Sequence, residues 1–92
     1  MQIEEIEKFL KKNIAGQQYV KINFKKRDTI YGLFVVDNDY NYLKAKNFWR
    51  IVPQSQLTAY SQSKNMNLAK IFNGSEFSRL TLYKDSFEEE TL

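Results

Sequence analysis

Apolar residues at the start of the chain recur at helical spacing. Ile3, Ile6 and Leu10 follow one another at steps of three and four, and Ile14 continues the series. Glutamates lie in the first turns of this segment and lysines in its last turn, which complements the dipole of a helix. The pattern predicts an amphipathic helix over residues 2–14.

After this helix the spacing of apolar residues changes to two, the period of a β-strand. In "YVKINFKK" the residues Val20, Ile22 and Phe24 fall on one face. The next run, "IYGLFVV", is apolar on both faces, as in a central strand. Gly32 within it indicates a sharp bend or a close backbone approach. The predicted strands cover residues 19–26, 29–37, 41–46, 48–52 and 77–83.

A polar segment with apolar residues at helical spacing separates the last two predicted strands. Leu68, Ile71 and Phe72 share one helical face, and "NG" at residues 73–74 would end the helix. We therefore predict two short helices, or one broken helix, over residues 53–73.

Together these elements predict an α+β or mainly β fold, with an N-terminal helix before a strongly bent five-strand antiparallel sheet. The sheet either closes into a small barrel or stays open and curved with the helix packed across it. A chain of 92 residues makes one domain. We place that domain at residues 1–84 and expect the acidic tail, residues 85–92, to be frayed.

The composition excludes several classes of chemistry. The chain has no cysteine, which removes disulfides and thiolate catalysis, and no histidine, which removes the usual general base and the commonest metal ligand. Asp37 and Asp39 lie two apart in a predicted turn, but a hard cation needs more oxygen ligands than these. We therefore expect a protein that is not an enzyme and that holds no metal and no cofactor.

The beginning of the sequence carries no secretory pattern. It starts acidic, without a continuous apolar segment, and no apolar run approaches the roughly 20 residues that span a bilayer. We expect a cytoplasmic protein with no membrane partner.

The net charge of +3 is unevenly distributed. Residues 11–50 carry nine lysines and arginines against three aspartates, whereas the first ten residues and the tail are acidic. A basic body of this kind attracts phosphate groups. The alternative is that the lysines are solvated strand residues that discourage pairing between sheet edges.

Tyrosines and lysines coincide on the predicted strands. Alternation places Tyr40, Tyr42, Lys44 and Lys46 on one face of the third strand. Bases stack on aromatic faces and lysines bind phosphates, so this face could bind single-stranded nucleic acid. Tyrosines also pair across ordinary strands, and that alternative stays open. The hypothetical nucleic-acid-binding residues are Tyr40, Tyr42, Lys21, Lys25, Lys44 and Lys46.

The fourth predicted strand offers an alternative interface. If Trp49 and Ile51 point inward, then Phe48, Arg50 and Val52 form an outward row. Such a row, with Phe48 and Arg50 as its main members, could bind another protein. Alternatively, the row is covered by the following helices, through Leu57, Tyr60, Leu68 and Phe72.

One stretch of the sequence resembles a known family. Gly32, Phe34 and the turn "NDYNYL", from Asn38 to Leu43, resemble the Sm-like family, which includes the RNA chaperone Hfq, and "WRIVP" resembles the strand that closes on proline in Hfq-like chains. The resemblance covers about residues 3–53. It implies a small β-barrel of Sm-like or SH3-like type whose turn contacts RNA bases. The chain also resembles short bacterial proteins that share "NFWRIV" and "IFNGSEF" patterns, which implies no activity.

The expected function is therefore a small non-catalytic binding module for RNA or single-stranded nucleic acid. The alternative is a protein–protein adaptor, or a structural subunit of a homo-oligomer. Sm-like barrels assemble through their edge strands, but the segment over residues 53–73 has no counterpart in that family. We therefore expect a monomer or dimer in preference to a closed ring.

Overall fold

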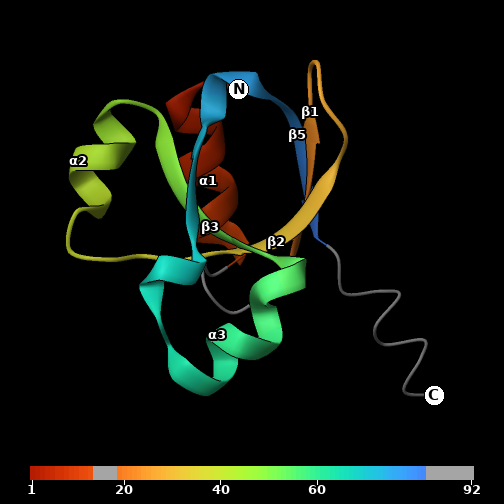
Figure 1. Cartoon of the computed structure of the whole chain (residues 1–92). Helices are drawn as coiled ribbons and strands as arrows, with labels where there is room; N and C mark the ends of the chain where they lie inside the picture. The colour runs from red at the N-terminus through yellow and green to blue at the C-terminus, as the bar shows by residue number, and fades with distance from the viewer. Residues whose placement is uncertain (14–18, 83–92) are drawn as a thin grey trace.

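The computed structural model describes residues 1–13 and 19–82. It shows an α+β fold in which one N-terminal helix packs against a five-stranded antiparallel sheet (Figure 1). The helices are α1 (Ile3–Asn13), α2 (Tyr40–Ala45) and α3 (Leu57–Ser63), and the strands are β1 (Val20–Phe24), β2 (Ile30–Phe34), β3 (Phe48–Pro53), β4 (Lys70–Asn73) and β5 (Phe77–Leu82). Three short 3-10 helices, η1 (Gln54–Gln56), η2 (Met66–Leu68) and η3 (Gly74–Glu76), complete the chain between β3 and β5.

The strands lie in the order β4-β3-β2-β1-β5, and every neighbouring pair is antiparallel. β2 is the middle strand of this order, as its apolar residues on both faces predicted. Its glycine, Gly32, pairs with Val20 of β1 on one side and with Pro53 of β3 on the other. β4 and β5 are the two edges of the sheet.

The predicted amphipathic helix is confirmed, and it buries the predicted face. Ile6 and Leu10 lie in the main core cluster with Trp49 and with apolar residues of β1, β2, β3 and β5. In the view of Figure 1, α1 lies between α2 and the strands β1 and β5. The predicted end of the helix at Ile14 and the acidic tail over residues 85–92 lie outside the described residues.

A second, smaller apolar cluster covers the opposite side of β2 and β3. Leu33, Val35 and Val52 are buried there beneath Leu57 and Tyr60, with Met66 and Ala69 beside them. Val52 is therefore fully covered and its predicted outward exposure is wrong. Of the residues proposed to cover this row, Leu57 and Tyr60 do so, whereas Phe72 packs against the main core cluster. The predicted inward positions of Trp49 and Ile51 are confirmed.

The third predicted strand is wrong, because residues Tyr40–Ala45 form α2. The backbone N–H of Leu43 donates to the carbonyl of Asp39 at 3.0 Å, which closes a helical turn. Leu43 is the buried residue of this helix. Over six residues, a single inward side chain fits a helix as well as a strand, so periodicity could not separate the two.

The helical prediction for residues 53–73 is confirmed at α3 and is wrong for the last four residues of the segment. α3 falls inside the predicted segment, but Lys70–Asn73 form β4, which pairs Phe72 with Trp49 and Lys70 with Ile51 of β3. Pairing with a preformed strand decides the conformation of such a short apolar run. The sheet thus has five strands as predicted, with β4 in place of the segment that forms α2.

No helix in the described ranges is long and apolar enough to span a bilayer.

Candidate functional site

Two of the predicted nucleic-acid-binding residues attach α2 to the rest of the molecule. Tyr40 is half-buried and meets Trp49 edge-on, with ring centres 6.1 Å apart. Burial raises the pKa of its phenol. The Lys44 ammonium lies 5.5 Å from the centre of the Tyr40 ring and forms an ion pair with Glu7 of α1. Both side chains therefore have structural partners.

The other two predicted residues of α2 pair with each other at the surface. The Tyr42 side chain is 63% exposed. The Lys46 ammonium lies 4.4 Å from the centre of the Tyr42 ring and donates a hydrogen bond to the Tyr42 hydroxyl at 2.8 Å. Tyr42 and Lys46 could meet a ligand, but on a helix and not on the predicted strand face.

Lys21 and Lys25 lie on β1 and at its end, apart from the α2 residues. Lys21 pairs across the sheet with Tyr31 of β2 and Thr81 of β5. Lys25 is exposed next to the tip of the β1–β2 hairpin. In the view of Figure 1, α2 lies on one side of the molecule and the β1–β2 hairpin on the other. The structure therefore does not bring the six predicted residues onto one surface.

The ion pair between α1 and α2 gives a testable titration. The hydrogen bond from Lys44 lowers the pKa of Glu7 below its ordinary value of 4.5. A depressed carboxyl pKa adds stability that is present above about pH 4.5 and is lost as the pH falls through the lower, folded value. We expect carboxyl NMR shifts to place the pKa of Glu7 below 4.5, and Lys44→Gln to move it back up.

Lys46→Gln is the matched control for this titration, because Lys46 pairs with Tyr42 and not with Glu7. It should leave the pKa of Glu7 unchanged. An ordinary Glu7 pKa in the wild type would show that α1 and α2 are not joined through this pair.

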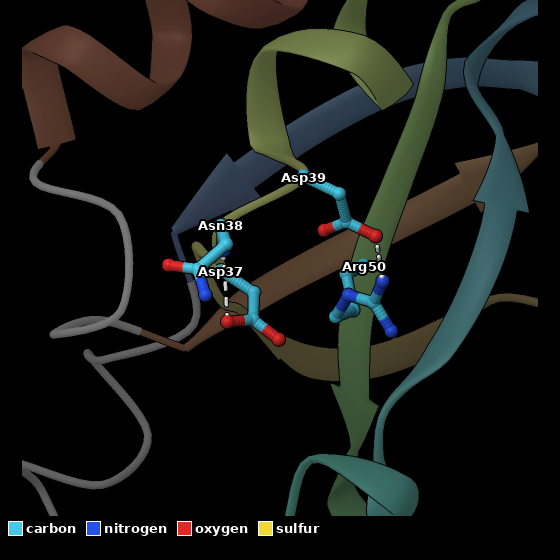
Figure 2. Close-up of polar contacts among 4 residues, drawn as sticks. All are labelled: Asp37, Asn38, Asp39 and Arg50. Carbon is cyan, nitrogen blue, oxygen red and sulfur yellow. Dashed lines mark hydrogen bonds and ion pairs between the residues drawn. The ribbon is translucent and has the colours of Figure 1, made fainter.

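The aspartates of the "DND" turn do not converge on a common point (Figure 2). Asp39 accepts a hydrogen bond from the Arg50 guanidinium at 2.5 Å, whereas Asp37 accepts from the backbone N–H of Asn38 at 2.8 Å. Asp39 Oδ1 and Arg50 Nε are buried with no hydrogen-bond partner among the described residues. Within the described ranges, no group of three or more possible metal ligands is found.

Arg50 is therefore not an open interface residue. Its side chain is only 18% exposed and its guanidinium is held by Asp39. Phe48 is half-buried, and it lines a groove that the sequence did not predict. The proposed outward row of β3 is thus divided: Val52 is covered, Arg50 is paired and Phe48 borders the groove.

This groove has a volume of about 660 Å³ and lies along the edge strand of the sheet. It is lined by residues of β3 and β4 and by Arg27 and Ile30 of the β1–β2 hairpin. Its apolar lining comes from Ile30, Phe48, Pro53, Ile71 and Phe72. Its polar lining comes from Arg27, Lys70, Asn73 and Glu76.

Arg27 fixes the hairpin against β4. Its guanidinium carbon lies 4.9 Å from the ring centre of Phe24 and 5.7 Å from that of Phe72. The two rings are themselves 6.0 Å apart. Because Arg27 is exposed above this aromatic pair, its charge remains open to a ligand in the groove.

Cations predominate around the groove. A neighbouring hollow of about 370 Å³ is lined by Lys25 and Lys26 together with Arg27, and Lys70 adds a further cation on β4. All four are exposed. In the sequence, Lys25 and Phe48 are candidates for two separate interfaces. The sequence missed Lys70, Ile71 and Phe72 because they were assigned to a helix.

Comparison with known proteins adds no relative. No family model, no curated protein and no solved structure matches this chain.

Proposed function

We propose that this protein is a small non-catalytic module that binds single-stranded nucleic acid in the groove between β4 and the β1–β2 hairpin. The observation that carries this proposal is the combination of an aromatic and apolar lining with an exposed cationic rim. Aromatic rings accept stacked bases of any sequence, and lysine and arginine bind the phosphates between them. The absence of cysteine suits a cytoplasmic location for such a module.

The fold type that we propose is a small barrel of Sm-like or SH3-like type. β1 pairs on both sides, with β2 and with β5, so the sheet is continuous around it. β4 and β1, which are not neighbours in the strand order, approach each other at one end. Phe24 of β1 contacts Phe72 of β4, and the backbone N–H of Lys25 donates to the carbonyl of Glu76 at 2.9 Å. Such a bend brings β4 towards β1 and leaves the groove between them.

The non-catalytic part of the proposal rests on the chemistry of the groove. Its polar side chains are two cations, one amide and one carboxylate. General acid–base catalysis needs a group whose pKa lies near the working pH. Histidine, the side chain that most often fills this role near neutral pH, does not occur in the chain, so we expect binding without turnover.

The test is a fluorescence anisotropy titration with a labelled ten-nucleotide single strand at two salt concentrations. We expect wild-type binding to weaken as salt rises, because phosphate contacts release counterions. The double variant Arg27→Gln/Lys70→Gln should bind about tenfold more weakly. Its logarithmic salt slope should be smaller by about 1.4, since each single-strand contact contributes about 0.7.

Tyr42→Ala/Lys46→Gln is the matched control, because it removes an aromatic–lysine pair from α2. We expect its affinity to stay within about twofold of wild type. If this control loses binding while the Arg27/Lys70 variant keeps it, the ligand lies on α2. If the wild type does not bind at low salt, the nucleic-acid proposal fails.

A protein ligand is the second candidate, favoured by one observation. β4 is an edge strand whose Ile71 is 51% exposed. An extended segment of another protein, or of a second copy, could add a strand there. Binding of this kind would change little with salt, whereas phosphate contacts are salt-sensitive. Light scattering on the same sample would show whether the chain is the expected monomer or dimer.

A further inference from the structure

Glu76 and Asn73 place hydrogen-bonding groups of opposite kind beside the groove. The Glu76 carboxylate is exposed and forms no hydrogen bond or ion pair with any other described residue. Within residues 1–13 and 19–82, its two acceptor oxygens therefore have no partner. The remaining polar residues of the lining, Arg27 and Lys70, are cations, which we assign to the phosphates.

The orientation of the Asn73 amide is fixed by its neighbours. Its Oδ1 accepts from the backbone N–H of Ser75 at 2.9 Å and from the Ser75 hydroxyl at 2.8 Å. A backbone N–H can only donate, so the atom that faces it must be the amide oxygen. The Asn73 NH₂ group is then the end left for a ligand. Besides the two cations, the groove offers one donor group, from Asn73, and two acceptors, from Glu76.

We infer that the groove prefers guanine among the bases. This inference rests on the proposed function. The Watson–Crick edge of guanine presents one acceptor, O6, followed by two donors, N1–H and N2–H. A carboxylate accepts both of these donors at once, and the Asn73 NH₂ group donates to O6. Phe48 pairs with Asn73 across β3 and β4, so its ring lies on the same face as that amide and can stack against the base.

The other bases do not match this set of groups. Cytosine presents one donor and two acceptors, so it would leave one carboxylate oxygen facing an acceptor. Uracil presents a single donor between two acceptors. Adenine presents one donor and one acceptor. Each of them places at least one acceptor against Glu76 or leaves a carboxylate oxygen without a partner, and such a mismatch lowers affinity.

The experiment uses labelled ten-nucleotide oligo-U strands in which the central base is U, G, A or C, at one low salt concentration. We expect the strand with guanine to bind at least about fivefold more tightly than the others. In Glu76→Gln this preference should fall below about twofold. Affinity for oligo-U should stay equal or rise, because a negative charge near the phosphates has been removed.

Asp28→Asn is the matched control, because it removes the same charge at the hairpin tip from a residue outside the groove lining. It should keep the full guanine preference. Equal wild-type binding of all four strands would overturn this inference and leave the proposed function standing. A guanine preference that survives Glu76→Gln would overturn the role of Glu76. Absence of binding to any strand would overturn both the inference and the proposed function.

Discussion

Replacing Phe77 with alanine should lower the free energy of unfolding by about 4 kcal/mol. Phe77 is fully buried at the start of β5. Its ring meets Phe24 edge-on at 5.3 Å and Phe34 at 6.4 Å, so it joins β5 to β1 and β2 through the core. Truncation leaves a cavity between these strands, and the packed rings on β1 and β2 cannot collapse to fill it.

Urea denaturation followed by the fluorescence of Trp49 measures this effect. Trp49 is the single tryptophan of the chain and lies in the same core cluster as Phe77. The matched control is Tyr42→Ala, which removes an aromatic ring that is 63% exposed. It should change the free energy of unfolding by less than about 1 kcal/mol. Similar losses for both variants would mean that Phe77 is not at the centre of the core.

Replacing Gly32 with alanine should lower the free energy of unfolding by about 2 to 3 kcal/mol. A Cβ at this position would lie 2.7 Å from Ile51 Cγ2 and 2.7 Å from the carbonyl oxygen of Val52. Ile51 is fully buried, and the Val52 oxygen belongs to the backbone of the paired strand β3. Neither neighbour can move aside cheaply, so β2 and β3 must separate.

The sign of the Gly32→Ala effect makes this test sharp. Glycine inside a strand ordinarily costs about 0.5 to 1 kcal/mol relative to alanine, so without a clash the substitution would stabilise the protein. Denaturation in urea, again followed by Trp49, gives the sign directly. A gain in stability would show that β2 and β3 do not approach as closely as described.

The same close approach shows how far local sequence could predict structure. The sequence indicated that Gly32 marks either a bend or a close backbone approach, and the structure confirms the close approach to β3. The sequence predicts that Gly74 ends a helix, but Gly74 begins η3 and is buried. A Cβ there would lie 2.6 Å from both Ile6 Cδ1 and Trp49 Nε1, groups that are distant in sequence.

The candidate site was the least predictable part of the molecule. Lys25 and Phe48 are separate candidates in the sequence, but the groove needs β4, and the sequence predicts a helix for those residues. The tyrosine and lysine face predicted for residues 41–46 depended on a strand that does not exist. Tyr40 instead packs against Trp49, and Lys44 forms an ion pair with Glu7. A short segment with one apolar contact carries too little periodicity to fix its own conformation.

The sequence by itself determined α1, β1, β2, β3 and β5. α1 has a clear helical period and β1 a clean alternation, and the others are short runs rich in β-branched and aromatic residues, bounded by polar turns or proline. The sequence also determined the α+β class and the inward positions of Trp49 and Ile51. Tertiary structure alone decided α2 and β4. β4 is a strand because β3 offers it backbone partners, and α2 is a helix anchored by Leu43, Tyr40 and the Glu7–Lys44 pair. These partners are remote in sequence, so no local pattern contains them, and the groove that β4 helps to form follows from the same long-range pairing.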